Sequence, residues 1–145
     1  MKQITKTVVL TAAQVNALDS TAITIIPAPA STSLIVIEEI TFAKLSGTAV
    51  GSCSTAPITT VYTGETTAIA GFASAANTQT FLSTGATAAN YLVTTKKPAV
   101  DFGGAGVAQA DCVGKGIDIT GAGATIGSFD GTLQVTATFK IVKIG

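Results

Sequence analysis

The chain has 145 residues, of which only 11% are charged, and its eight lysines balance eight carboxylates to give a formal net charge of zero. An average soluble domain carries about 25% charged residues, so the surface must be built largely from Thr, Ser, Gly, Ala and Asn. The length fits one domain with a core of its own, which we expect over residues 1–145. No cluster of basic residues could neutralise phosphates, which excludes electrostatic binding of nucleic acid.

Alternating hydrophobicity and an abundance of Thr, Val and Ile predict strands along most of the chain. In chain order, strands are expected at Lys6–Leu10, Ala22–Ile26, Leu34–Lys44, Ile58–Tyr62, Thr66–Phe72, Asn77–Leu82, Asn90–Thr95, Ile117–Thr120 and Thr132–Ile141. Only Ala12–Leu18 is expected to be helical, with Thr11 as its N-cap. Met1–Thr5 precedes the first predicted strand and is expected either to be a frayed terminus or to form an arm that adds as an edge strand to a neighbour.

Two strands show how their faces are expected to be used. In Leu34–Lys44 the pair Glu38-Glu39 breaks the alternation, and a β-bulge there would return Ile40 and Phe42 to the core face. Thr132–Ile141 alternates strictly and follows the turn signal Asp130-Gly131.

Many short strands, Gly-rich corners and almost no helix indicate an all-β fold. We expect a jelly-roll-like β-sandwich of two antiparallel sheets with one short helix near the N-terminus. An immunoglobulin-like sandwich is the second choice, because the chain lacks the core tryptophan typical of that fold.

For the location of the protein, we consider whether the sequence contains a membrane-spanning helix or a signal peptide. No apolar run reaches the roughly 18 residues that a membrane-spanning helix needs, so we expect no membrane partner. Lys2 and Lys6 precede a segment that is too short and too polar for a convincing signal peptide. We therefore expect synthesis and use in the cytoplasm, or a mature form whose signal was removed. Cys53 and Cys112 allow a disulfide, but in a reducing compartment two buried thiols are expected instead.

Few residues of the sequence suit a catalytic site, and we expect no enzyme activity, cofactor or metal. The chain contains no histidine, which removes serine and cysteine nucleophiles paired with an imidazole and most zinc sites. Asp101, Asp111, Asp118 and Asp130 lie in or beside predicted loops, where a carboxylate pair for glycoside hydrolysis or a calcium site is arithmetically allowed. Capping of turns by these side chains is the simpler interpretation. The glycines of residues 114–116 and 121–127 match neither phosphate-binding motif fully and are expected to form turns.

The opening third of the chain resembles small structural proteins of tailed bacteriophages. The resemblance rests on V-V-L-T-A-A-Q-V-x-A-L from Val8 to Leu18, on T-I-I-P-A-P from Thr24 to Pro29, on the long apolar third strand, and on the alternating strand after Asp130-Gly131. This family includes head decoration, or cement, proteins and related virion components. The middle of the chain, residues 51–127, matches it only in composition.

The resemblance implies a β-sandwich, frequently trimeric, on the outside of an icosahedral capsid, with the major capsid protein and further copies of itself as partners. Its implied task is to reinforce the lattice, and no catalytic residue comes with it. We expect the partner contacts at Met1, Lys2, Gln3, Ile4 and Thr5. Two alternatives stay open: a pilin-like surface-fibre subunit, which would need an oxidised Cys53–Cys112 pair, and a head-fibre or tail jelly roll that binds a receptor.

Overall fold

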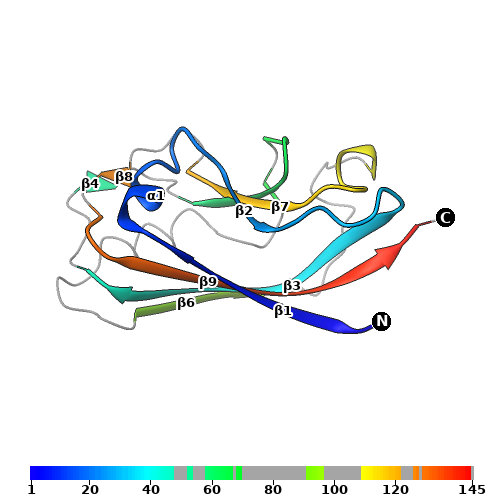
Figure 1. Cartoon of the computed structure of the whole chain (residues 1–145), viewed down its shortest axis with the longest axis horizontal. Coiled ribbons are helices and arrows are strands. Elements are labelled where there is room, and N and C mark those ends of the chain that lie inside the picture. The colour runs from blue at the N-terminus through cyan, green and yellow to red at the C-terminus, as the bar shows by residue number, and fades with distance from the viewer. Residues whose placement is uncertain are drawn as a thin grey trace.

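The computed structural model of the chain describes residues 1–47, 52–53, 58–66, 68–69, 91–96, 109–121, 126–127 and 129–144. In these residues two antiparallel sheets face each other as two layers (Figure 1). The larger sheet has the strand order β1-β9-β3-β6 and the smaller one β2-β7-β5, while β4 and β8 form a separate short pair. This arrangement confirms the predicted β-sandwich; its jelly-roll connectivity stays a prediction.

The strand bounds follow the alternation of the sequence closely. The larger sheet contains β1 (Gln3–Leu10), β9 (Thr132–Lys143), β3 (Ser33–Ser46) and β6 (Tyr91–Lys96). The smaller sheet contains β2 (Ile23–Ile26), β7 (Ile117–Thr120) and β5 (Thr59–Tyr62). The short pair consists of β4 (Ser52–Cys53) and β8 (Ile126–Gly127), neither of which the alternation predicted.

Two of the expected strands lie wholly or largely outside the described residues. Of the predicted strand Thr66–Phe72, only Ala68 pairs in the described residues, through an isolated bridge to Val61. The predicted strand Asn77–Leu82 lies outside the described residues.

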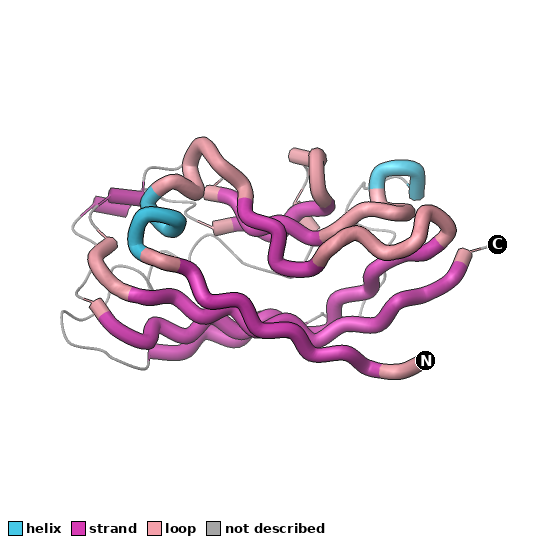
Figure 2. The backbone as a smooth tube through the Cα atoms, in the orientation of Figure 1, coloured by secondary structure: helices cyan, strands magenta, loops and turns pink. Residues whose placement is uncertain are grey.

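The helix α1 (Ala12–Asn16) begins as the sequence predicted. Thr11 is the N-cap, and its hydroxyl and the Gln14 side chain complete a reciprocal capping box. The helix ends two residues earlier than expected, because Leu18 is reached through a turn in which its amide donates to the carbonyl of Val15. Val15 and Leu18 are both buried and lie three residues apart. This spacing is typical of a helix, which is why the sequence predicted a longer helix than the structure contains. Figure 2 shows α1 at one end of the sandwich and the short 3₁₀ helix Gln109–Asp111 at the other.

The predicted bulge in β3 is confirmed. The register with β9 runs regularly to Ile37↔Phe139, then shifts so that Glu39 pairs with Thr138 and Glu38 is the extra residue. Both glutamates are half-buried, whereas Ile37 before them and Ile40 and Phe42 after them are buried. One inserted residue therefore restores the inward face of a long strand, so that Ile40 and Phe42 join the core.

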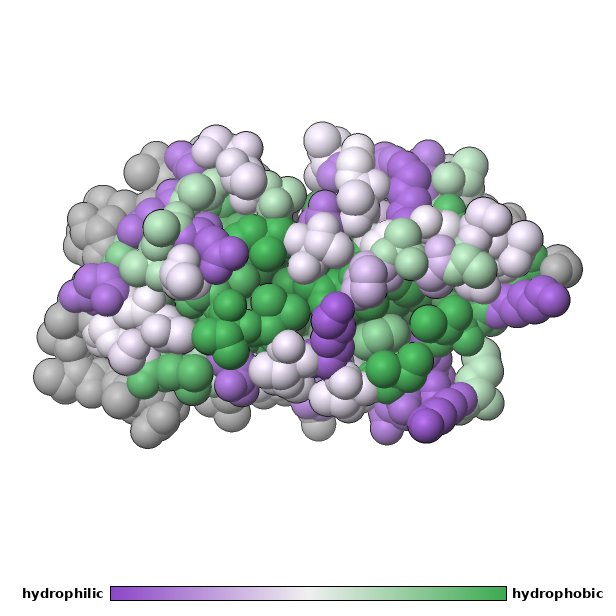
Figure 3. Space-filling view, viewed as in Figure 1, coloured by the Kyte–Doolittle hydropathy of each residue, from purple (hydrophilic) through white to green (hydrophobic). Residues whose placement is uncertain are grey.

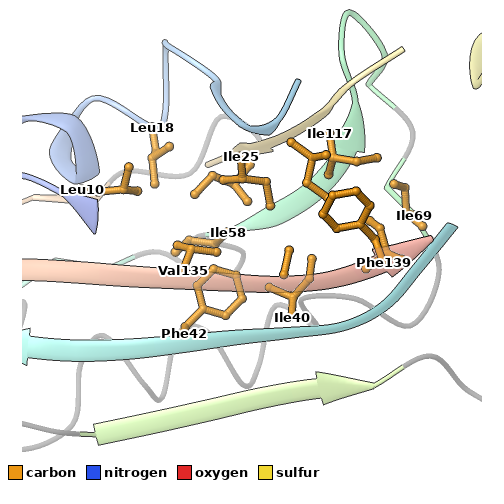
Figure 4. Packing of buried hydrophobic residues seen from close by; sticks show 14 of the residues in the cluster. Leu10, Leu18, Ile25, Ile40, Phe42, Ile58, Ile69, Ile117, Val135 and Phe139 are labelled. Atoms are coloured by element: carbon orange, nitrogen blue, oxygen red, sulfur yellow. The ribbon is translucent and has the colours of Figure 1, made fainter. Parts of the chain in front are cut away.

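The core fills the space between the two layers. Figure 4 shows Ile25 and Ile117 of the smaller sheet facing Ile40, Phe42 and Val135 of the larger one. Leu10 and Leu18 close the core at the α1 end (Figure 4). The same end is fixed by Asn16, whose side-chain amide donates to the Phe129 carbonyl at 2.8 Å and accepts from the Phe129 amide at 2.9 Å. These paired bonds tie α1 to the segment that leads into β9.

We expect deletion of Glu38 to leave a folded protein. Removing the extra residue joins Ile37 to Glu39 and converts β3 into a regular strand whose inward positions are unchanged. The loss should be about 1 kcal/mol of unfolding free energy, the scale of a partly exposed ion pair, measured by urea denaturation. Deletion of Thr41 is the control, because it turns Ile40 and Glu39 to the wrong faces and should abolish cooperative unfolding. Equal effects of the two deletions would contradict the assigned bulge.

Candidate assembly surface

The five predicted contact residues lie at and within an edge of the larger sheet. Gln3, Ile4 and Thr5 belong to β1 and pair with Lys140, Phe139 and Thr138 of the same chain. Met1 and Lys2 alone precede the strand. The segment expected as an arm is therefore shorter than predicted, because the alternation of Ile4 between polar neighbours continues into the strand. Whether these residues contact a partner stays a prediction.

The outer face of the larger sheet carries a ladder of threonines. Thr7 is the register partner of Thr136 in β9, and Thr136 is the partner of Thr41 in β3. The hydroxyls of Thr7 and Thr136 lie 3.1 Å apart, and those of Thr5 and Thr138 lie 3.4 Å apart. Directly opposed threonines stabilise a sheet while presenting methyl and hydroxyl groups with no net charge. This face can therefore approach a neighbouring protein at a low cost in desolvation.

Two opposite charges at one end of this face compensate each other. The bulge residue Glu38 forms an ion pair with Lys140, and it also accepts a hydrogen bond from the Gln3 side chain. Three strands of the sheet are joined by these contacts, because Gln3 lies in β1, Lys140 in β9 and Glu38 in β3. The bulge therefore has two effects: it repairs the core register, and it places a carboxylate between two donors.

Lys44 is a buried lysine that the sequence analysis did not single out. Its side chain is 0% exposed, and its ammonium lies 5.6 Å from the centre of the Phe129 ring. Burial lowers the pKa of Lys44, and the nearby Asp130 carboxylate opposes that shift by favouring the charged form. The sequence did indicate this burial, because Lys44 follows Ile40 and Phe42 at intervals of two residues and therefore shares their inward face of β3.

A second polar group lies in the smaller sheet. Asp118 was expected in or beside a loop, but it lies in β7, is buried, and accepts a hydrogen bond from the Thr63 hydroxyl at 2.8 Å. The alternation predicted the strand but not the burial of Asp118, which lies on the face opposite to the core residues Ile117 and Ile119. The hydrogen bond from Thr63 explains how the Asp118 carboxyl group is accommodated in this sheet, since buried polar groups need hydrogen-bond partners.

The end of the sandwich near the 3₁₀ helix is built from a thiol, a phenol and an ion pair. Cys112 is a buried thiol, and burial raises its pKa. Tyr62 is also buried, which raises the pKa of its phenol, and its hydroxyl donates to the Ile35 carbonyl at 2.8 Å. Lys115 and Glu65 form an ion pair beside them. A thiol with a raised pKa is a poor nucleophile, so this group is suited to packing.

The predicted turns and the remaining site calls can be placed only in part. Gly114 adopts a φ of 72°, a conformation that favours glycine, which confirms the expected turn at residues 114–116. In the described residues, no three side chains of the kinds that ligate metals gather into a group. The Cys53 side chain and Asp101 lie outside what the structure describes. Cys112 is a free thiol, as expected for a reducing compartment, and not half of the alternative Cys53–Cys112 disulfide. Among the described residues, no helix has the length and apolar character needed to cross a membrane.

Comparison with known proteins gives one structural likeness. No family model and no curated protein matches the chain. A solved structure described as a cyanophage Pam1 capsid asymmetric unit contains a chain that is 17% identical, with 99% of this chain and 84% of that chain covered and a TM-score of 0.49. At this identity and score the likeness establishes neither a family nor a function.

We expect the substitution Lys44→Met to stabilise the protein, by about 1 kcal/mol near neutral pH, because burial penalises the ammonium more than the nearby Asp130 carboxylate favours it, as the lowered pKa of Lys44 indicates. The lowered pKa of Lys44 means that the folded state loses this proton at a lower pH than the unfolded state does. The unfolding free energy of the wild type should therefore rise as pH increases from the lowered pKa towards the ordinary value of 10.5.

Urea denaturation at a series of alkaline pH values measures this contribution as the difference between wild type and variant. The difference should shrink as pH rises, whereas the control Lys143→Met, at an exposed position of β9, should show no such trend. A variant that is less stable than the wild type at every pH would show that the ammonium is a net stabilising group.

Proposed function

We propose that this chain is a virion structural protein of a tailed bacteriophage, a decoration or cement protein that binds the outside of an assembled capsid. In this proposal it acts as a trimer, its partner is the major capsid protein, and its effect is to stabilise the lattice. The observation that carries the proposal is the outer face of the larger sheet, a broad surface lined by Thr7, Thr136 and Thr41 with an ion pair between Glu38 and Lys140 at one end.

The resemblance of the first third and the last strand to phage decoration proteins supports the same role. Those segments correspond to β1, α1, β2, β3 and β9, which include three of the four strands of the larger sheet. The resemblance and the surface chemistry therefore concern the same part of the molecule.

A role of this kind needs complementary surfaces and no active site. A protein that binds the assembled lattice better than free subunits stabilises the lattice by linkage. Many copies arranged on a symmetric shell convert weak individual contacts into strong retention. A surface with little charge suits such a task, because neighbouring copies do not repel one another.

The proposal is tested by adding the purified protein to capsids that lack it. We expect saturable binding to assembled capsids, no binding to free capsid protein, and an increase in the temperature at which the shell disassembles. Thr136→Lys should weaken binding by about tenfold or more, because it places an uncompensated charge at the centre of the outer face. Thr21→Lys, at an exposed position between α1 and β2, is the matched control and should bind as the wild type does.

Two results would contradict the proposal. The first is a protein that remains unbound at saturating capsid concentrations. The second is equal binding of the Thr136→Lys and Thr21→Lys variants, which would place the contact on another face.

A further inference from the structure

The first strand presents the longest regular edge among the described strands; β6, at the other edge of the larger sheet, pairs over six residues. β1 pairs with β9 on one side over eight consecutive register partners, without a bulge, and no described strand pairs with its other side. The edge strand β2 is short, has a register shift between Thr24 and Ile26, and is followed by Pro27. The edge strand β5 is also short, and its Val61 is bridged by Ala68. Long regular edges are templates for pairing, whereas short, bulged or proline-bounded edges are protected from it.

Apolar side chains lie directly under this edge. Ile4 and Val8 of β1 and Ile23 of β2 are only partly buried and pack against the core, and we name these three residues the β1–β2 seam. Figure 3 shows apolar surface between the two layers on the side where β1 and β2 lie nearest the viewer in Figure 1. An additional strand beside β1 would place its inward side chains over the seam.

The charge of this edge selects the kind of strand that fits. Lys6 lies between Ile4 and Val8 on the same face of β1 and is exposed. In the described part of the chain it takes part in no ion pair. β1 contains no carboxylate, and Lys2 adds a further positive charge just before it. The nearby Glu38 is already engaged by Gln3 and Lys140.

We propose that β1 is the acceptor for an extended segment of a partner protein, which adds to the larger sheet as a fifth strand. The segment has the pattern apolar–polar–acidic–polar–apolar, with its carboxylate opposite Lys6 and its apolar residues over Ile4 and Val8. Directly opposed residues share a face of the sheet, which sets this spacing. The β1 strand of a second copy is a poor occupant, since it brings Lys6, with Lys2 just before it, and no carboxylate to a basic edge. The inference deepens the proposed function by naming the chemistry of the partner segment.

The test uses the purified full chain and a blocked synthetic peptide of sequence Thr-Val-Thr-Glu-Thr-Val-Thr. The peptide reads the same in both directions, so its glutamate faces Lys6 in either strand orientation. A second peptide with lysine in place of glutamate is its matched control. Binding is measured from amide chemical shifts in NMR titrations. We expect the acidic peptide to bind about three- to tenfold more tightly than the basic one, the range set by one exposed charge pair. The shifts should be concentrated in β1.

Substitutions then reverse the preference. Lys6→Glu should favour the basic peptide, while Lys143→Glu, which makes the same change of charge beyond the β1 register, should keep the wild-type order. Three results would overturn the inference: no binding of either peptide, shifts concentrated outside β1, or a preference that Lys6→Glu leaves unchanged. If Lys6 only protects the edge from pairing, neither peptide binds and Lys6→Thr causes self-association. No capsid is present in the experiment, so its outcome is separate from that of the capsid-binding assay.

Discussion

The antiparallel pairing of β3 with β9 is the constraint on which the rest of the structure depends. These are the longest strands of the described residues, and their register extends from Ser33↔Lys143 to Ser46↔Thr132. β9 also carries β1 on its other side. The C-terminal strand therefore lies between two N-terminal ones, and the larger sheet cannot be completed until the whole chain is present. Contacts between such distant segments cost loop-closure entropy before they contribute stability, which is typical of slowly folding β-proteins.

The same pairing divides the molecule into an inner and an outer surface. On the inner face, Phe42 and Val135 are register partners and join the core. On the outer face, Thr41 and Thr136 are partners and extend the threonine ladder. The bulge at Glu38 keeps both patterns in phase along β3. The threonine-lined outer face is therefore a direct consequence of the register that builds the core, because neighbouring residues of a strand point to opposite faces.

Much of this could be predicted from the sequence, because period-two alternation reports burial directly. The bulge at Glu38, the cap at Thr11 and the terminal strand were each set by local patterns that the tertiary structure did not override. The roles of Lys44, Asn16 and Asp118 depend instead on partners far along the chain, namely Phe129 and Thr63. Local periodicity contains no information about such pairs. The short strands β4 and β8 were missed for a related reason, since two residues are too few to show alternation.

The proposed role as a capsid-binding protein would use several of these features together. The low charge, the compensated ion pair of Glu38 and Lys140 and the regular edge of β1 all favour contact with other protein chains over chemistry on a small molecule. The most direct measurement is an electron cryomicroscopy map of phage particles that contain this chain. It should show the outer face of β1, β9 and β3 against the capsid, with added density along the edge of β1 that no other described strand pairs with. A chain that turns this sheet to solvent, or that is absent from the particle, would contradict the account.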